Sequence, residues 1–189
     1  KTNSAYSGGG VYNNNDSSPD IDRCTFEGNT AGTGGGMCNT ASSPAVRNCF
    51  FTSNTATVYY GGGIHNSAAN PSVINCVFKS NTAVIHGGGL DNYNSGMTAT
   101  NCTFTMNSSQ YGGGVYTYDS YTNLNNCIIW GNDASAGGDE IGMVGNVINN
   151  YTTTLNYSCY GNSAGDIHQS GGTFSAPNSI TSDPRLLKD

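Results

Sequence analysis

The chain has 189 residues, of which only 10% are charged, and its formal net charge is −6. Six lysine and arginine residues in all exclude a basic nucleic-acid surface, and no apolar stretch approaches the roughly 18–20 residues that span a bilayer. Because charge is low, self-repulsion does not hold the chain open, and regularly spaced apolar residues indicate a small, ordered core.

Three features recur along the chain at a period of about 26 residues, which is typical of a repeat architecture. Each copy has a run of three glycines, then a cysteine, then an asparagine. The glycine runs begin at Gly8, Gly34, Gly61, Gly87 and Gly112; the cysteines are Cys24, Cys49, Cys76, Cys102 and Cys127; the asparagines are Asn3, Asn29, Asn54, Asn81, Asn107 and Asn132.

The copy at 61–83 shows what each position does. Apolar residues after the glycines and around the cysteine alternate with polar ones, which favours short strands with one buried face. Proline in the linker marks a turn, and asparagine tolerates the left-handed backbone of a bend. We therefore expect inward side chains at Ile64, Val73, Cys76 and Phe78, and bends at Asn66, Asn75 and Asn81.

Three short strands per copy predict an all-β parallel β-helix, a solenoid of about seven coils of about 26 residues. A single domain should span 1–189, with regular repeats over 1–142 and a divergent C-terminal coil and capping segment over 143–189. Length varies mainly at one corner, where extra residues bulge outward at Thr57–Tyr60 and Val84–His86. Stacked coils should place like residues about 4.8 Å apart, in ladders.

The glycine copies GGGVYN, GGGIHN and GGGLDN, with segments such as CTFEGNTA, resemble the repeats of bacterial surface β-helix proteins. That group includes the polymorphic-membrane-protein type, with its GG-[AI] and FxxN signatures. The C-terminal order of NCIIWGN, Tyr157-Ser158 and Asn178–Pro184 is similar to the end of many secreted bacterial β-helix proteins. The resemblance implies a right-handed, single-stranded parallel β-helix that is secreted or on the cell surface, usually without catalytic activity.

The first copy begins within a coil, because Asn3 is already a ladder asparagine. The chain is therefore expected to be a processed product or a fragment. An uncapped end could stack on another copy and generate a filament. The main functional prediction is a non-enzymatic, extracellular structural or adhesive protein that self-associates end to end; the alternative is a carbohydrate-binding or polysaccharide-degrading protein.

Seven cysteines cannot all pair. The five in the repeats should form an inward ladder of buried thiols, because in-register parallel strands give poor disulfide geometry. Cys38 and Cys159 lie outside this ladder. No Cys-x-x-Cys spacing indicates zinc or redox chemistry, and we expect no metal and no cofactor.

One column of polar residues follows the first inward residue of each copy. Stacking would bring Cys38, His65 and Asp91 to successive coils, flanked by Tyr12 and Tyr116. Such a row could be a metal site or a nucleophile–base–acid arrangement. The favoured interpretation is an exposed polar face, because a flat sheet offers no pocket.

Aromatic residues gather in the later copies and form the predicted binding surface. They could stack on sugars or pack on another protein, or they could be ordinary tyrosine ladders. The corner carries Tyr59, Tyr60, His86 and Tyr111, and the next turn carries Tyr93, Tyr116, Tyr118 and Tyr121.

An enzyme of this architecture, a polysaccharide lyase or hydrolase, would need clustered carboxylates. The repeat aspartates are scattered among columns, and we predict no catalytic residue. Those aspartates are Asp16, Asp20, Asp22, Asp91 and Asp119.

The GGDEI segment at Gly137–Ile141 is interpreted as part of the repeat, because it lies in register with the glycine corners and no α/β pattern surrounds it.

Overall fold

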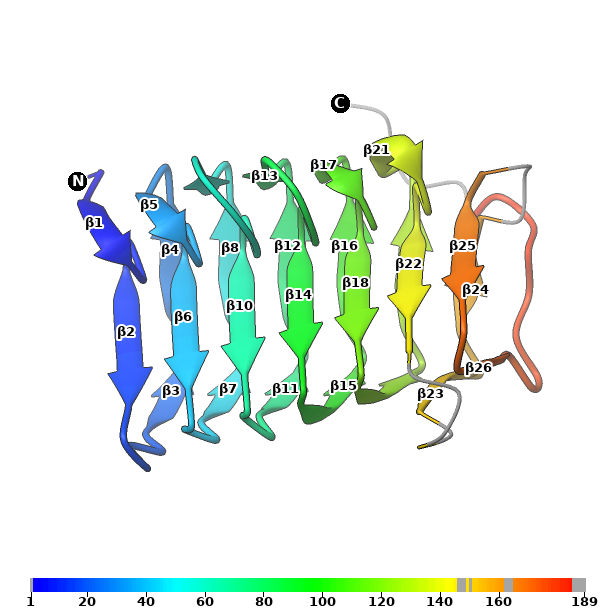
Figure 1. Ribbon diagram of the computed structural model, residues 1–189, viewed down its shortest axis with the longest axis horizontal. Helices are drawn as coiled ribbons and strands as arrows, with labels where there is room; N and C mark the ends of the chain where they lie inside the picture. The colour runs from blue at the N-terminus through cyan, green and yellow to red at the C-terminus, as the bar shows by residue number, and fades with distance from the viewer. Residues whose placement is uncertain (1, 146–148, 150, 162–164, 185–189) are drawn as a thin grey trace.

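The chain winds as a stack of coils along one long axis, with the N-terminal and C-terminal strands at opposite ends (Figure 1). The computed structural model describes residues 2–145, 149, 151–161 and 165–184. Every strand pair is parallel, and each complete coil contributes one strand to each of four sheets. The described strands form six complete coils and begin a seventh, which makes the fold a parallel β-helix, as predicted.

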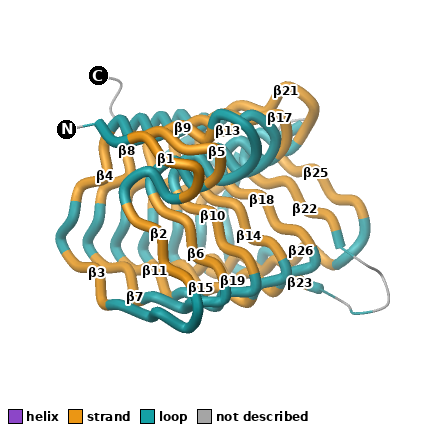
Figure 2. The backbone as a smooth tube through the Cα atoms, turned by 60° about the vertical axis from the view of Figure 1, so that its left-hand side comes forward, coloured by secondary structure: helices purple, strands orange, loops and turns teal. Residues whose placement is uncertain are grey.

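The four sheets are named A to D in the order in which a coil visits them, and Figure 2 shows successive coils following nearly the same path. Sheet A contains β1 (Ser4–Ser7), β5 (Thr30–Thr33), β9 (Thr55–Ala56), β13 (Thr82–Ala83), β17 (Ser108–Tyr111) and β21 (Asp133–Gly137). Sheet B contains β2 (Val11–Asn14), β6 (Met37–Thr40), β10 (Ile64–Ser67), β14 (Leu90–Tyr93), β18 (Val115–Tyr118), β22 (Ile141–Val144) and β25 (Ile167–Ser170). Sheet C contains β3 (Asp20–Asp22), β7 (Ala45–Arg47), β11 (Ser72–Ile74), β15 (Gly96–Thr100), β19 (Tyr121–Asn125), β23 (Thr152–Asn156) and β26 (Thr173–Ser175). Sheet D contains β4 (Thr25–Glu27), β8 (Phe50–Thr52), β12 (Val77–Lys79), β16 (Thr103–Thr105), β20 (Ile128–Trp130) and β24 (Cys159–Tyr160).

The prediction of three strands per coil is wrong, because sheet A supplies a fourth. Its strands lie between the ladder asparagine and the glycine run, and β9 and β13 have only two residues each. A strand of two residues is too short to show an alternation of apolar and polar side chains, so the hydrophobic pattern did not predict these strands.

The glycine runs let neighbouring coils approach closely. Gly61 has a φ of +67°, and a Cβ there would lie 2.5 Å from the carbonyl oxygen of Ile64. A Cβ on Gly62 would clash with the carbonyl oxygen of Gly88 in the next coil. Both positions therefore exclude side chains, which explains why the run recurs in every regular coil.

Apolar side chains stack in columns inside the coil, as predicted for Ile64, Val73, Cys76 and Phe78. The phenylalanine column is the clearest, because its rings lie 4.6–4.9 Å apart and within 4–7° of parallel. Offset stacking of this kind adds to the burial of each ring. The column consists of Phe26, Phe51, Phe78 and Phe104.

A buried asparagine ladder holds the bend between sheets D and A. In a typical rung, Asn54 donates from Nδ2 to Oδ1 of Asn81 at 2.9 Å and to the carbonyl of Phe26 at 2.8 Å. The backbone N–H of Asn54 donates to the same Oδ1 at 3.0 Å. Each amide thus satisfies donors that would otherwise be buried without partners. The buried rungs are Asn29, Asn54, Asn81, Asn107 and Asn132.

Asn66 does not lie at a bend, although the sequence predicted one there. It is the third residue of the coil's first long strand, β10, so its side chain points inward like that of Ile64. There it accepts a hydrogen bond from Nδ2 of Asn39 at 2.8 Å. Asn75 does occupy a bend, with a φ of 54°.

All seven cysteines are free thiols, and Cys24 is the only partly exposed one. Within the ladder the thiols donate to carbonyl oxygens two residues earlier: that of Cys49 to Arg47 at 3.0 Å, and that of Cys76 to Ile74 at 3.2 Å. The weak S–H donor is thereby paired inside the core.

The C-terminal end of the buried ladder is a glutamate that the sequence analysis did not single out. Glu140 takes the third position of the sixth glycine corner, where the regular coils have glycine. Its carboxylate accepts from Nδ2 of Asn132 at 2.5 Å and from the N–H of Gly131 at 2.7 Å. Burial raises the pKa of Glu140 to about 7, although these hydrogen bonds oppose the shift.

Removing one buried amide should be costly. In Asn81→Ala, two donors of Asn54 lose their acceptor, and we expect the free energy of unfolding to fall by about 2–4 kcal/mol. Urea denaturation measures this. The matched control is Asn101→Gly in an exposed ladder, because glycine keeps the left-handed backbone of φ 55°, and the loss should stay below about 1 kcal/mol. Equal losses in the two variants would contradict the assignment.

The raised pKa of Glu140 predicts a pH dependence of stability. The folded state holds this proton more tightly than the unfolded chain, so the stabilisation is complete below the ordinary value near 4.5 and is lost as pH rises through about 7. Denaturation at pH 4 and pH 8 should show this contribution, up to about 3 kcal/mol, in wild type but not in Glu140→Gln. Glu27→Gln, at an exposed position, should keep the wild-type slope.

Candidate functional site

The outward side of sheet B carries the predicted polar column. Because strand residues alternate, His65 and Asp91 point outward and pair in register, as do Asp91 and Tyr116. Tyr93 and Tyr118 point outward two residues further along the same strands. One sheet face therefore holds the polar column together with Tyr93, Tyr116 and Tyr118 of the following turn.

The bulged corner between sheets A and B supplies further rings. Tyr60, His86 and Tyr111 occupy equivalent places in three successive coils and are joined by parallel bridges. The extra residues just before Tyr60 and His86 let this corner turn over sheet B. The extra residues at this corner, predicted from the variable length of the copies, thus cover the polar column.

The cover is a set of stacked rings. The ring centroid of His86 lies 5.0 Å from that of Tyr60 and 4.0 Å from that of Tyr116, with both pairs within 10° of parallel. Tyr60 also lies 5.6 Å from the imidazole of His65. We name the surface formed by these rings and their exposed neighbours the aromatic face, which comprises Tyr59, Tyr60, His86, Tyr93, Tyr111, Tyr116 and Tyr118.

The prediction that the polar column is exposed is wrong. Cys38, His65, Asp91 and Tyr116 are at most 7% exposed, whereas Tyr12, in the first coil, is 49% exposed. The reason is the corner insertions, which place the rings of Tyr60 and His86 over residues that a flat sheet would leave open.

His65 and Asp91 form a buried polar pair. Nδ1 of His65 lies 2.7 Å from Oδ2 of Asp91, and both side chains are more than nine-tenths buried. A buried carboxylate is costly unless it is paired. The pair therefore satisfies both groups beneath the rings, and neither is presented to solvent.

Cys38 does not join this pair as a nucleophile. Burial, together with the nearby charge of Asp91, raises the pKa of its thiol to about 11, so it is a neutral thiol near pH 7. Its nearest polar partner is Oγ1 of Thr40 at 3.9 Å. In the described part of the chain, no three His, Cys, Asp or Glu residues are placed to hold a metal ion.

The rings that cover the pair carry no charge near neutral pH. Burial lowers the pKa of His86 below its ordinary value, although the charge of Asp91 opposes this. Burial likewise raises the pKa of Tyr116. The aromatic face is therefore suited to an uncharged partner.

Several rings of the aromatic face remain open to solvent. Tyr59 and Tyr93 are 42% and 41% exposed. The rings of Tyr93 and Tyr118 stack with centroids 5.1 Å apart and 11° from parallel. Their spacing is that of the coils, so the stack runs along the β-helix axis.

Tyr121 alone among the eight predicted aromatic residues lies away from this face. It begins β19, beyond the corner between sheets B and C, and its ring lies 5.1 Å from that of Tyr151. Its hydroxyl donates to the carbonyl of Asn149 at 3.0 Å. A shallow cavity of about 340 Å³ adjoins these two tyrosines and is also lined by Asn70 and Asn94.

Tyr151 and His168 extend the aromatic surroundings, and sequence reasoning missed both. The ring of His168, in β25, lies 6.2 Å from that of Tyr111. Both residues follow position 143, where the glycine and cysteine register ends. The pairing of Gly142 with His168 shows that sheet B continues without that signal.

Comparison with protein families matches residues 2–164 to the model of the right-handed beta helix region. The chain belongs to the right-handed β-helix family. Comparisons with curated proteins and with solved structures found no match. Membership of this family establishes the architecture of the β-helix protein, whereas its activity depends on the side chains at its surfaces.

The repeat aspartates of the β-helix protein lie on different parts of the coil. Asp20 pairs with Arg47 at 2.7 Å and Asp22 with Arg23 at 2.8 Å, both on the exposed side of sheet C and its following bend. Asp91 is buried on sheet B. Among the described residues no helix is long and apolar enough to cross a membrane.

Breaking the buried pair of the β-helix protein should destabilise it. In Asp91→Ala the imidazole of His65 stays buried without its partner, and we expect a loss of about 3–5 kcal/mol. Thermal and urea denaturation measure it. Asp133→Ala, at an exposed position of β21, should change stability by less than about 0.5 kcal/mol. A loss below 1 kcal/mol in Asp91→Ala would contradict a tightly covered pair.

Proposed function

We propose that this β-helix protein is a non-enzymatic, extracellular adhesive protein whose aromatic face binds an extended, neutral polysaccharide. The observation that carries the proposal is the in-register stack of Tyr93 and Tyr118 beside the rings of the bulged corner. Tyrosine rings that are partly open to solvent offer apolar contact and, through their hydroxyl groups, hydrogen bonds.

The charge of the face favours a neutral partner. Its carboxylate, Asp91, is buried beneath the rings, and His86 is neutral near pH 7. A charged polymer would find no opposite charge there. A neutral sugar ring presents an apolar side to aromatic rings and hydroxyl groups to the tyrosine oxygens.

The rigidity of the coil supports adhesion. Each ring is fixed to a strand or corner that is hydrogen bonded on both sides, as at His86, whose backbone bridges Tyr60 and Tyr111. A preformed surface loses little conformational entropy on binding, which favours affinity. The coil spacing also repeats contacts along the axis, as an extended polymer requires.

A polysaccharide-degrading function has less support. Lyases and hydrolases need carboxylates that converge on a bound chain, with or without calcium. On the aromatic face, Asp91 is occupied by His65, and Asp20 and Asp22 lie on another sheet paired with arginines. End-to-end association of copies into a filament stays a prediction from the sequence.

The test uses neutral glucan, mannan and galactan, with polygalacturonate as the acidic comparison, in affinity electrophoresis followed by calorimetry. We expect binding to a neutral polymer, weakened about tenfold or more in the double variant Tyr93→Ala, Tyr118→Ala. Tyr6→Ala is the matched control, because Tyr6 is 85% exposed on β1, away from the face.

Two results would contradict the proposal. One is the absence of binding to every neutral polymer. The other is the release of new reducing or unsaturated ends from a bound polymer, which would make the protein an enzyme. Circular dichroism of each variant confirms that loss of binding is not loss of fold.

A further inference from the structure

A second asparagine ladder runs along the exposed corner between sheets C and D. Asn126 donates from Nδ2 to Oδ1 of Asn101 at 2.7 Å, and Asn101 donates to Asn75 at 3.1 Å. Asn75 donates in turn to Asn48 at 3.2 Å. Each residue immediately precedes a cysteine of the inward ladder and has a left-handed backbone, with φ of 52–55°.

Tyr157 interrupts this ladder. It precedes Ser158, which takes the cysteine position in the sixth coil, and Asn178 precedes Ser179 in the next. Both keep the left-handed backbone, with φ of 49° and 56°. A bulky residue is uncommon in this conformation, whereas asparagine adopts it readily. The backbone conformation at position 157 thus favours asparagine, but the residue there is tyrosine.

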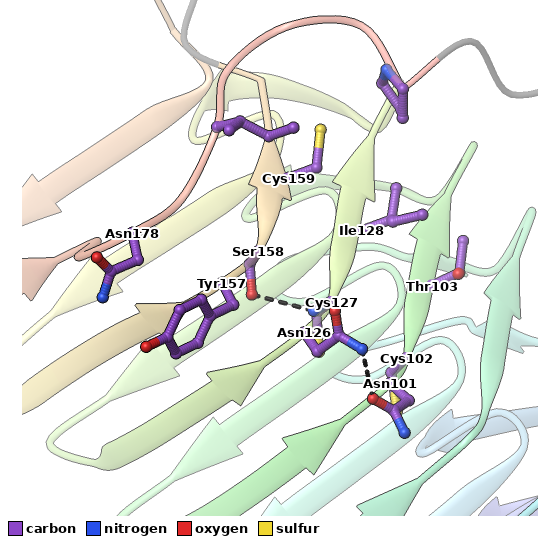
Figure 3. Close-up of a pocket in the computed structure, with 12 residues that line it drawn as sticks. Asn101, Cys102, Thr103, Asn126, Cys127, Ile128, Tyr157, Ser158, Cys159 and Asn178 are labelled. Atoms are coloured by element: carbon purple, nitrogen blue, oxygen red, sulfur yellow. Dashed lines mark hydrogen bonds between the residues drawn. The ribbon is translucent and has the colours of Figure 1, made fainter.

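The interruption leaves two amide groups without their ladder partner. An asparagine at 157 would donate to Oδ1 of Asn126 and accept from Nδ2 of Asn178, following the direction of the other rungs. Among the described residues neither of these two atoms has a hydrogen-bond partner. An acceptor and a donor therefore stand on either side of the tyrosine ring, as Figure 3 shows.

The same residues line a groove of about 610 Å³, within the usual size of small-molecule sites. The ring of Tyr157 is 70% exposed, and Ile180, 58% exposed, adds apolar surface from the C-terminal segment. That segment is held by the bond from the N–H of Ile180 to the carbonyl of Ser158 at 2.9 Å. None of the described lining residues is charged; the remaining ones are Cys102, Thr103, Cys127, Ile128, Cys159 and Pro184.

We propose that this groove is a second binding site, for one pyranose unit of a neutral oligosaccharide. The ring of Tyr157 would stack on the C–H side of the sugar. Hydroxyl groups both donate and accept, so they can satisfy Oδ1 of Asn126 and Nδ2 of Asn178 together. The uncharged side chains of the described lining favour a neutral ligand. The site shares no residue with the aromatic face and stands independently of the function proposed for it.

Tyr157→Asn is the sharpest test, because it completes the ladder while removing the ring. We expect the midpoint of urea denaturation to rise, and the affinity for neutral hexasaccharides of glucose, mannose or galactose to fall at least about tenfold. Tyr157→Phe should keep affinity within about threefold of wild type. Tyr6→Asn is the matched surface control.

Calorimetry gives the affinities, and NMR shift changes at Asn126 and Asn178 locate the sugar. Wild-type protein that binds none of the hexasaccharides, or a Tyr157→Asn variant that binds as tightly as wild type, would overturn the site. The double variant at Tyr93 and Tyr118 is titrated alongside. If this double variant loses polymer binding but still binds the hexasaccharide at Tyr157, the two sites are independent.

Discussion

The structure depends on one constraint: each residue lies directly over its equivalent in the next coil. In-register parallel pairing fixes this, as at Ile64, which pairs with Met37 and Leu90. Like side chains in a column therefore stabilise one another, whether by ring stacking, as at Phe78, or by amide hydrogen bonds, as at Asn81. The thin core suffices because each coil shares its contacts with two neighbours.

The same constraint explains how a flat sheet acquires a covered site. Extra residues at one corner do not disturb the columns, since the chain rejoins its register at the next glycine run. Instead they fold over sheet B, where Tyr60 and His86 enclose His65 and Asp91. Stability and surface chemistry are thus carried by different parts of each coil.

The two asparagine ladders end differently, and each ends at a polar group that can bind a proton or a hydrogen-bond donor. The buried ladder passes to the carboxylate of Glu140, whose protonation then affects stability. The exposed ladder stops at Asn126 and leaves its oxygen facing the groove beside Tyr157. A regular ladder satisfies its own polar groups, so a replaced rung is where a ligand or proton can compete.

The regular spacing of residues was enough to predict the coil, the inward columns of Ile64 and Phe78, and the buried ladder through Asn81, because a fixed spacing returns each residue to the same place around the axis. It missed the two-residue strands of sheet A, where no alternation can develop, and it left the polar column exposed. The cover of the corner over His65, and the place of Tyr157 between Asn126 and Asn178, became visible in the folded chain. The path of an insertion and the pairing of irregularly spaced coils depend on contacts across the stack, which local spacing does not encode.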